Sequence, residues 1–178
     1  PPGVAAGVER ITGQPLREVY GMTECGGVIC VDPVWTARVP GSAGLLIPFC
    51  EVQARRLDAG RPAATVCAPG EAGVLVVRGP QVTPGYVQGA HDAALFTDDG
   101  WLVTGDLGRV QEDGRVFITG RAKDLIIRSG HNIDPAAIED CLRAHPAVAD
   151  AAAVGLPDAY AGEVPVAYVA LKPGADAS

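Results

Sequence analysis

Residues 101–126 read WLVTGDLGRVQEDGRVFITGRAKDLI, and the surrounding fold is organised about this stretch. Within it, Asp113-Gly114 lies between two β-like runs, Arg109–Gln111 and Val116–Thr119. An Asp-Gly pair readily adopts the positive φ angles of a tight hairpin turn. The pattern therefore predicts two antiparallel strands joined at residues 113 and 114.

The region ahead of this hairpin, from about residue 39, contains further short apolar runs between Gly, Pro and Asp turn residues. Such alternation is typical of a small, mostly antiparallel barrel or sandwich. The predicted strands in this region are Glu51–Leu57, Val74–Arg78 and Trp101–Thr104.

The first 38 residues have a different pattern. Residues 4–11 indicate the end of a helix, and Leu16–Tyr20 predicts a short strand that leads into a glycine-containing loop. A transition from strand to loop is where open α/β sheets place their ligand contacts. We therefore look for a binding site directly after Tyr20.

A helix is predicted over residues 135–145. Asp134 is a suitable N-cap and Pro135 a suitable first helical residue, while apolar residues recur at helical spacing up to Pro146. Val148–Leu156 and Val164–Leu171 then predict two strands. This order of elements is typical of a small α+β unit.

The predicted fold class is thus mixed α/β and α+β, with a boundary near residue 121. We expect residues 1–120 to belong to one domain, with an α/β tail over about 1–38 and a small antiparallel β-barrel over about 39–120. Residues 121–178 are expected to form an incomplete α+β domain.

Composition excludes several functional classes. The 178 residues carry a net charge of -7, which argues against binding to nucleic acid or to anionic lipid. No apolar run approaches the ~20 residues that span a bilayer. The five cysteines form no CxxC pair, so we expect no zinc site and a reducing, cytoplasmic location. Because Met22 is the only methionine and the chain starts at Pro1, we expect that the chain begins inside a longer protein or has been processed.

The loop at Tyr20–Glu24 combines an aromatic ring, a glycine, a hydroxyl and a carboxylate. A nucleotide site needs such groups together, for base stacking, close backbone approach, phosphate contact and an oxygen ligand for Mg²⁺. The alternative is a surface turn with a partly buried tyrosine and a solvated glutamate.

Three motifs follow one another in the chain: Tyr20-Gly21-Met22-Thr23-Glu24, Thr104-Gly105-Asp106 and Gly120-Arg121-Ala122-Lys123-Asp124. Their order and spacing resemble the adenylate-forming (AMP-binding) superfamily, most closely acyl-CoA synthetases of the fatty-acid or aryl-acid CoA ligase type. The resemblance implies that residues 1–120 are the downstream part of the large AMP-binding domain and that 121–178 begin the C-terminal domain.

For the first motif, the resemblance implies that Tyr20 stacks on adenine within a loop completed by Gly21 and Met22. Thr23 would contact the α-phosphate and Glu24 would bind Mg²⁺, so both are candidate catalytic residues. The later stretch from Gly70 to Gly85-Tyr86 also resembles a family signature, to which we assign a structural role.

For the later motifs, the resemblance implies that Asp106 accepts hydrogen bonds from both ribose hydroxyls, which suits the two oxygens of a carboxylate. Arg121 would contact ribose and phosphate, and Lys123 would be the hinge between two catalytic arrangements. Gly130 would let the pantetheine arm of coenzyme A pass. Ser129 stands where the family often has glycine. The alternatives are a turn-capping aspartate, an exposed Arg-x-Lys-Asp turn and a plain turn glycine.

The implied activity joins a carboxylic acid to CoA with ATP through an acyl-adenylate, releasing pyrophosphate and AMP, with Mg²⁺ as cofactor. Two alternatives stay open: an amino-acid adenylation domain that loads a carrier protein, and a non-catalytic AMP-binding module. Nothing in the chain resembles the family's phosphate loop or its near-C-terminal lysine, so we expect these 178 residues to be an inactive fragment that lacks upstream and C-terminal portions.

Overall fold

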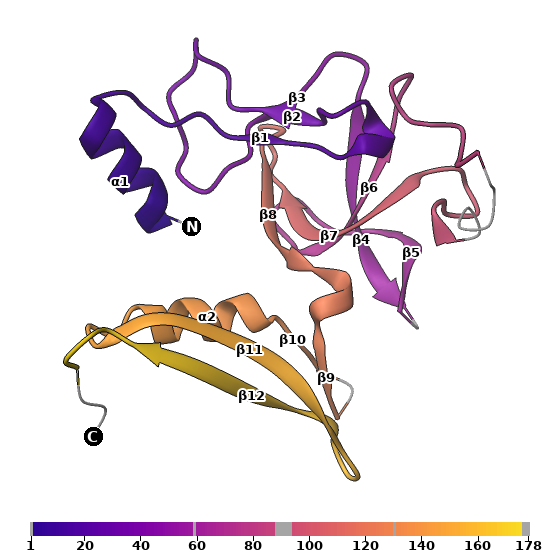
Figure 1. Ribbon diagram of the computed structural model, residues 1–178. Helices are drawn as coiled ribbons and strands as arrows, with labels where there is room; N and C mark the ends of the chain where they lie inside the picture. Colours follow the sequence, from indigo (N-terminus) through magenta and orange to yellow (C-terminus); the bar gives the residue numbers. More distant parts are fainter. Residues whose placement is uncertain (1, 59, 88–93, 130, 176–178) are drawn as a thin grey trace. The chain divides into compact units, whose positions relative to one another are not determined.

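The computed structural model describes residues 2–58, 60–87, 94–129 and 131–175 (Figure 1). The chain divides into two compact units, Pro1–Thr119 and Gly120–Ser178. Among the described residues, no helix is both long enough and apolar enough to span a membrane.

The first unit begins with helix α1 (Pro2–Thr12) and a small antiparallel sheet. This sheet has the order β1-β2-β3, with β1 at Val19–Tyr20, β2 at Cys30–Val31 and β3 at Leu45–Leu46. The predicted helix is confirmed, and the predicted strand at Leu16–Tyr20 is reduced to its last two residues.

The main element of the first unit is a five-stranded sheet with the order β5-β4-β6-β7-β8 (Figure 1). Its central strand β6 is buried up to its last residue, Arg78, since each side chain from Val74 to Val77 is at most 1% exposed. The strand bounds are β4 Glu51–Asp58, β5 Arg61–Val66, β6 Gly73–Arg78, β7 Leu102–Val110 and β8 Val116–Arg121.

The expectation of a β-barrel is wrong, because the five-stranded sheet is open within the described parts of the chain. Closure would require the two edge strands, β5 and β8, to pair. Instead, the outer edge of β8 is occupied by the segment ahead of β3, where Val116 N donates to Gly44 O at 3.0 Å and Ala43 N donates to Val116 O at 2.8 Å.

The predicted hairpin is confirmed. Gly114 has φ 82°, its N–H donates to Gln111 O at 3.0 Å, and Gln111 N donates to Arg115 O at 2.9 Å. The two runs predicted at Trp101–Thr104 and Arg109–Gln111 are, however, parts of the single strand β7.

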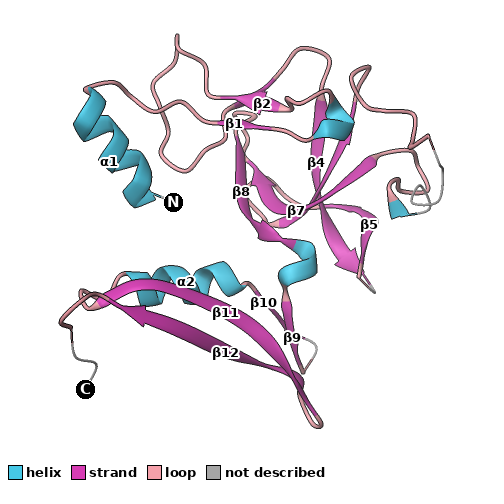
Figure 2. Cartoon of the chain, viewed as in Figure 1, coloured by secondary structure: helices cyan, strands magenta, loops and turns pink. Residues whose placement is uncertain are grey.

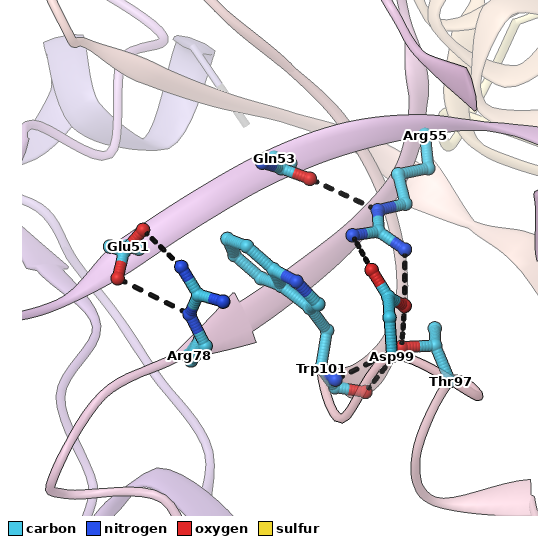
Figure 3. A network of polar contacts seen from close by, with 7 residues as sticks. All are labelled: Glu51, Gln53, Arg55, Arg78, Thr97, Asp99 and Trp101. Atoms are coloured by element: carbon cyan, nitrogen blue, oxygen red, sulfur yellow. Dashed lines mark hydrogen bonds and ion pairs between the residues drawn. The ribbon is translucent and has the colours of Figure 1, made fainter. Parts of the chain in front are cut away.

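The loop ahead of β7 is fixed to the sheet by a buried arginine (Figure 3). Arg55 is only 3% exposed and donates from both terminal nitrogens to the two oxygens of Asp99, each at 2.8 Å. The indole ring of Trp101 lies under the guanidinium groups of Arg55 and Arg78. The central guanidinium carbon (Cζ) is 5.1 Å from the ring centroid in Arg55 and 4.4 Å in Arg78. The bond from Arg55 is the main reason why the pKa of Asp99 lies well below its usual value.

The second unit contains a four-stranded sheet with the order β10-β9-β12-β11, and helix α2 packs against the β11–β12 hairpin (Figure 2). Asp134 caps α2 by accepting from Ala136 N at 2.9 Å, which confirms the predicted start of this helix. The element bounds are η3 Ala122–Asp124, β9 Ile126–Arg128, β10 His131–Ile133, α2 Pro135–Arg143, β11 Val148–Asp158 and β12 Gly162–Leu171.

The two predicted strands of this unit are confirmed; β11 continues two residues past its predicted end, and β12 begins two residues before its predicted start. The helix ends at Arg143, two residues before its predicted end at 145. Strands β9 and β10 were not predicted, because strands of three residues leave no periodic signal in the sequence.

Candidate functional site

The loop after β1 has a fixed backbone. A Cβ at Gly21 would lie 2.1 Å from the carbonyl oxygen of Gly27, so only glycine fits here. The following residues form the short helix η1 (Thr23–Cys25), in which Cys25 is 1% exposed and anchors the loop in the core. Thr23 is exposed and Glu24 is half-buried, so the loop presents both side chains from a rigid base.

The end of β1 meets the second motif directly. Tyr20 Oη donates a hydrogen bond of 2.6 Å to Oδ2 of Asp106, which lies on β7 and is 7% exposed. Burial, and next the hydrogen bond to Asp106, raise the pKa of Tyr20 far above its ordinary value. Tyr20 is therefore a protonated donor throughout the physiological pH range.

A β-bulge in β7 sets the position of Asp106. Val74 of β6 pairs with Leu107 of β7, and Val76 pairs with Val103, so three residues of β6 lie opposite five residues of β7. Gly105 lies inside this bulge with φ 76°, a conformation that few other residues tolerate.

The hydroxyl of Thr104 stabilises this bulge from both sides. It donates to the Leu75 carbonyl at 2.8 Å and accepts from Asp106 N at 3.0 Å. The Thr-Gly-Asp tripeptide is thus a bulge with a defined geometry, which turns a buried carboxylate toward the loop after β1.

The carboxylate of Glu24 is bound by a second tyrosine. Tyr86 Oη donates to Glu24 Oε1, and Thr83 N donates to the backbone oxygen of Glu24 at 2.8 Å. The hydrogen bond from Tyr86 is the main cause of the lowered pKa of Glu24. The sequence analysis gave Tyr86 only a structural role, and a contact across 62 residues leaves no signal in a single sequence.

The third motif belongs to the second unit. Arg121 is the last residue of β8 and Lys123 lies in η3, and both side chains are exposed. Gly130 lies outside the described residues. Its neighbour Ser129 has φ 50°, in the left-handed region that favours glycine.

The described residues contain no group of three or more His, Cys, Asp or Glu side chains that could hold a metal ion. Glu24 therefore offers a single carboxylate. One carboxylate fits Mg²⁺, which commonly binds to proteins through one or two carboxylates and takes its other ligands from water and substrate phosphates.

Comparison with known proteins finds one enzyme family over most of the chain. A model of the AMP-binding enzyme family matches residues 1–87, and a model of the AMP-binding enzyme C-terminal domain matches residues 137–178. The chain belongs to the AMP-binding enzyme family. Together the two matches cover more than half of this family member and include the Tyr20–Glu24 loop.

Relatives of this AMP-binding enzyme chain include CoA ligases. Marinolic acid–CoA ligase from Pseudoalteromonas sp. (strain SANK 73390) is 47% identical over 167 residues, which are 94% of this chain and 26% of the relative. The crystal structure of ATP-bound MatB from Rhodopseudomonas palustris matches 99% of this chain with a TM-score of 0.89 and 34% identity.

O-succinylbenzoate coenzyme A synthetase (MenE) from Bacillus subtilis, in complex with ATP and magnesium ion, matches 92% of this chain with a TM-score of 0.72 and 39% identity. The chain covers 34% of the MatB structure and 33% of the MenE structure. It therefore spans about a quarter to a third of the length of these three proteins.

Proposed function

We propose that this chain is part of an acyl-CoA synthetase that activates a carboxylic acid with ATP. In the first step, a carboxylate oxygen of the acid attacks the α-phosphorus of ATP, and pyrophosphate leaves. In the second step, the thiol sulfur of CoA attacks the acyl carbonyl carbon, loses its proton, and displaces AMP. The adenylate divides one difficult condensation into two easier steps.

The observation that carries the proposal is the contact between Tyr20 and Asp106, in a chain 47% identical to a CoA ligase. It brings the start of the loop that would bind the nucleotide to the carboxylate that would bind the ribose. Asp106 has two oxygens with several acceptor positions, so the hydrogen bond from Tyr20 leaves capacity for ribose hydroxyls.

The other residues have roles that follow from their chemistry. The exposed Thr23 hydroxyl would donate to an α-phosphate oxygen, and the Tyr20 ring would stack on adenine. Glu24 would hold Mg²⁺, which supplies positive charge to the phosphates when it is bound. Arg121 would contact ribose and phosphate, Lys123 would be the hinge, and Gly130 would lie beside CoA.

The test uses the protein expressed from its complete reading frame. With ATP, Mg²⁺, CoA and a panel of fatty and aryl acids, we expect AMP and an acyl-CoA thioester, detected by mass spectrometry. Asp106→Ala should lower kcat/KM for ATP by at least about tenfold to a hundredfold, because even one hydrogen bond to a charged group contributes ~1.5–3 kcal/mol. The absence of AMP with every acid, or an unchanged kcat/KM, would overturn the proposal.

Two further outcomes are informative. With amino acids added to the panel, formation of aminoacyl-AMP without transfer to CoA would support a domain that loads a carrier protein. The isolated 178 residues should not catalyse ATP–pyrophosphate exchange, because they span only about a quarter to a third of the relatives described above. Exchange by this fragment would contradict that expectation, and calorimetric binding of AMP without turnover would indicate a binding module.

A further inference from the structure

We infer that Tyr86 is a positioning residue, whose phenol orients the Glu24 carboxylate toward a bound divalent cation. The inference rests on the proposed role of Glu24 and adds a residue to which the sequence gave only a structural role. Tyr86 would touch neither the cation nor the nucleotide and would act through Glu24.

Two separate hydrogen bonds join the turn at Thr83–Tyr86 to the loop after β1. Thr83 N donates to the backbone oxygen of Glu24 at 2.8 Å, and Tyr86 Oη donates to the side-chain Oε1 of the same residue. The backbone bond docks the turn against the loop. The phenol bond acts only on the direction of the carboxylate.

The turn itself is held in shape, so the phenol has a defined position. The Thr83 hydroxyl donates to the Gly85 carbonyl at 3.0 Å. The opposing loop is equally fixed, because Cys25 is buried directly after Glu24 and Gly21 packs against Gly27. The phenol and the carboxylate therefore meet from two rigid segments.

The chemistry of a carboxylate ligand gives this contact its consequence. A glutamate side chain has several rotatable bonds, so its carboxylate needs a partner to hold its direction. A carboxylate that binds a metal commonly accepts a hydrogen bond from such a partner as well. A phenol on Oε1 restricts the side chain while leaving acceptor positions on the carboxylate. Removing such a partner typically lowers metal affinity about tenfold to a hundredfold.

The test measures how strongly Mg²⁺ enhances ATP binding to the protein from its complete reading frame. Calorimetry gives the Kd for ATP in EDTA and in excess Mg²⁺, and the ratio of the Kd in EDTA to the Kd in Mg²⁺ measures how much the cation strengthens ATP binding. In Tyr86→Phe, which keeps the ring, we expect this ratio to fall about tenfold, with the Kd in EDTA unchanged within about twofold. The KM for Mg²⁺ in the acid-activation assay should rise, while kcat at saturating Mg²⁺ is largely retained.

The matched control is Tyr160→Phe, because Tyr160 is 100% exposed in the β11–β12 turn and its variant should keep the wild-type ratio. Thermal unfolding of each variant verifies that it is folded. In a Glu24→Gln background, Tyr86→Phe should have no further effect on the ratio, since the phenol acts only through the carboxylate.

The outcomes separate the two proposals. If Glu24→Gln lowers the ratio and Tyr86→Phe does not, the role of Tyr86 is refuted and that of Glu24 stands. If Tyr86→Phe raises the ratio, the phenol competes with the cation, and positioning is also refuted. If Glu24→Gln leaves the ratio unchanged, both roles are refuted.

Discussion

The hydroxyl of Tyr20 lies 2.6 Å from Oδ2 of Asp106, although 86 residues separate the two in the sequence. The contact joins the three-stranded sheet to the bulged strand β7. The ring of Tyr20 also packs against both hydrophobic clusters of the first unit, so this one residue connects the candidate site to the core.

Tyr20→Phe should destabilise the protein. The substitution keeps the ring and removes the donor to a carboxylate that is 7% exposed, so we expect the free energy of unfolding to fall by about 1.5–3 kcal/mol. Urea denaturation measures the change, with Tyr160→Phe at an exposed site as the control. Equal midpoints for the two variants would show that the hydrogen bond contributes no net stability.

Stability should also fall at alkaline pH. Burial raises the pKa of Cys25 from 9.0 to about 11 and that of Cys30 from 9.0 to about 12. Above pH 9 the unfolded chain loses these protons while the native protein retains them, so the unfolding free energy decreases with rising pH. The contribution is complete below pH 9 and is lost as pH rises through 11 and 12.

Denaturation of the wild type at pH 8 and pH 10.5 measures this fall, and Cys25→Ala should show a smaller one. A fall of the same size in Cys25→Ala would assign the effect to other groups.

The exposed thiol of Cys141 should react with a thiol reagent in the native protein much faster than the four buried thiols, and Cys141→Ser should remove that fast phase.

The sequence was most informative where local chemistry determines local structure. Asp113-Gly114 predicted a turn and Asp134-Pro135 predicted a helix start, because the residues that make these features are neighbours in the chain. It was least informative where the partners are distant. The open sheet depends on Val116 pairing with Gly44, a contact that no local pattern encodes.

The candidate site shows the same limit. Motif residues identified the loop after Tyr20 and the carboxylate of Asp106, yet the two tyrosine hydroxyls that hold the carboxylates became visible only in three dimensions. The bulge at Gly105 was also missed, because an irregularity in strand register depends on the neighbouring strand.

Phe49→Gly should stabilise the first unit. Phe49 follows Pro48 in a turn closed by Cys50 N donating to Ile47 O at 3.2 Å, and it has φ 63° with 84% of its surface exposed. A bulky residue is strained in this conformation, and glycine is preferred at this turn position. We expect a gain of roughly 1 kcal/mol in the free energy of unfolding. Phe49→Ala should give no comparable gain, since alanine retains the Cβ; a similar gain in both variants would assign the effect to the exposed ring.

Asp99→Asn should destabilise the protein more than Glu51→Gln. Asp99 neutralises the buried Arg55, whereas Glu51 pairs with Arg78 at a site where both side chains are more than half exposed. Because the pKa of Asp99 is lowered in the native state, its contribution is present above its ordinary pKa and is lost as pH falls through the lowered value. Thermal unfolding at pH 7 and pH 3 should show a large difference between wild type and Asp99→Asn at pH 7 and a smaller one at pH 3. A constant difference would refute the electrostatic explanation.

Glu139→Ala should make the protein prone to association through the edge of β11. That strand is the last in its sheet, and two α2 side chains occupy its outer backbone groups: Glu139 Oε1 accepts from Ala153 N at 3.0 Å, and Arg143 donates to Ala151 O at 2.7 Å. Unpaired strand edges recruit other strands, and a charged side chain on the edge prevents this.

Removing the Glu139 carboxylate exposes the Ala153 N–H, and we expect concentration-dependent growth in particle mass, measured by analytical ultracentrifugation, with a loss of about 1 kcal/mol in stability. Asp140→Ala is the matched control, because the Asp140 carboxylate pairs with the side chain of Arg143 at 3.5 Å and not with a backbone group of β11 among the described residues, so its variant should keep the mass of the wild type. If both variants have the wild-type mass at high concentration, β11 is protected by something other than the side chains of α2.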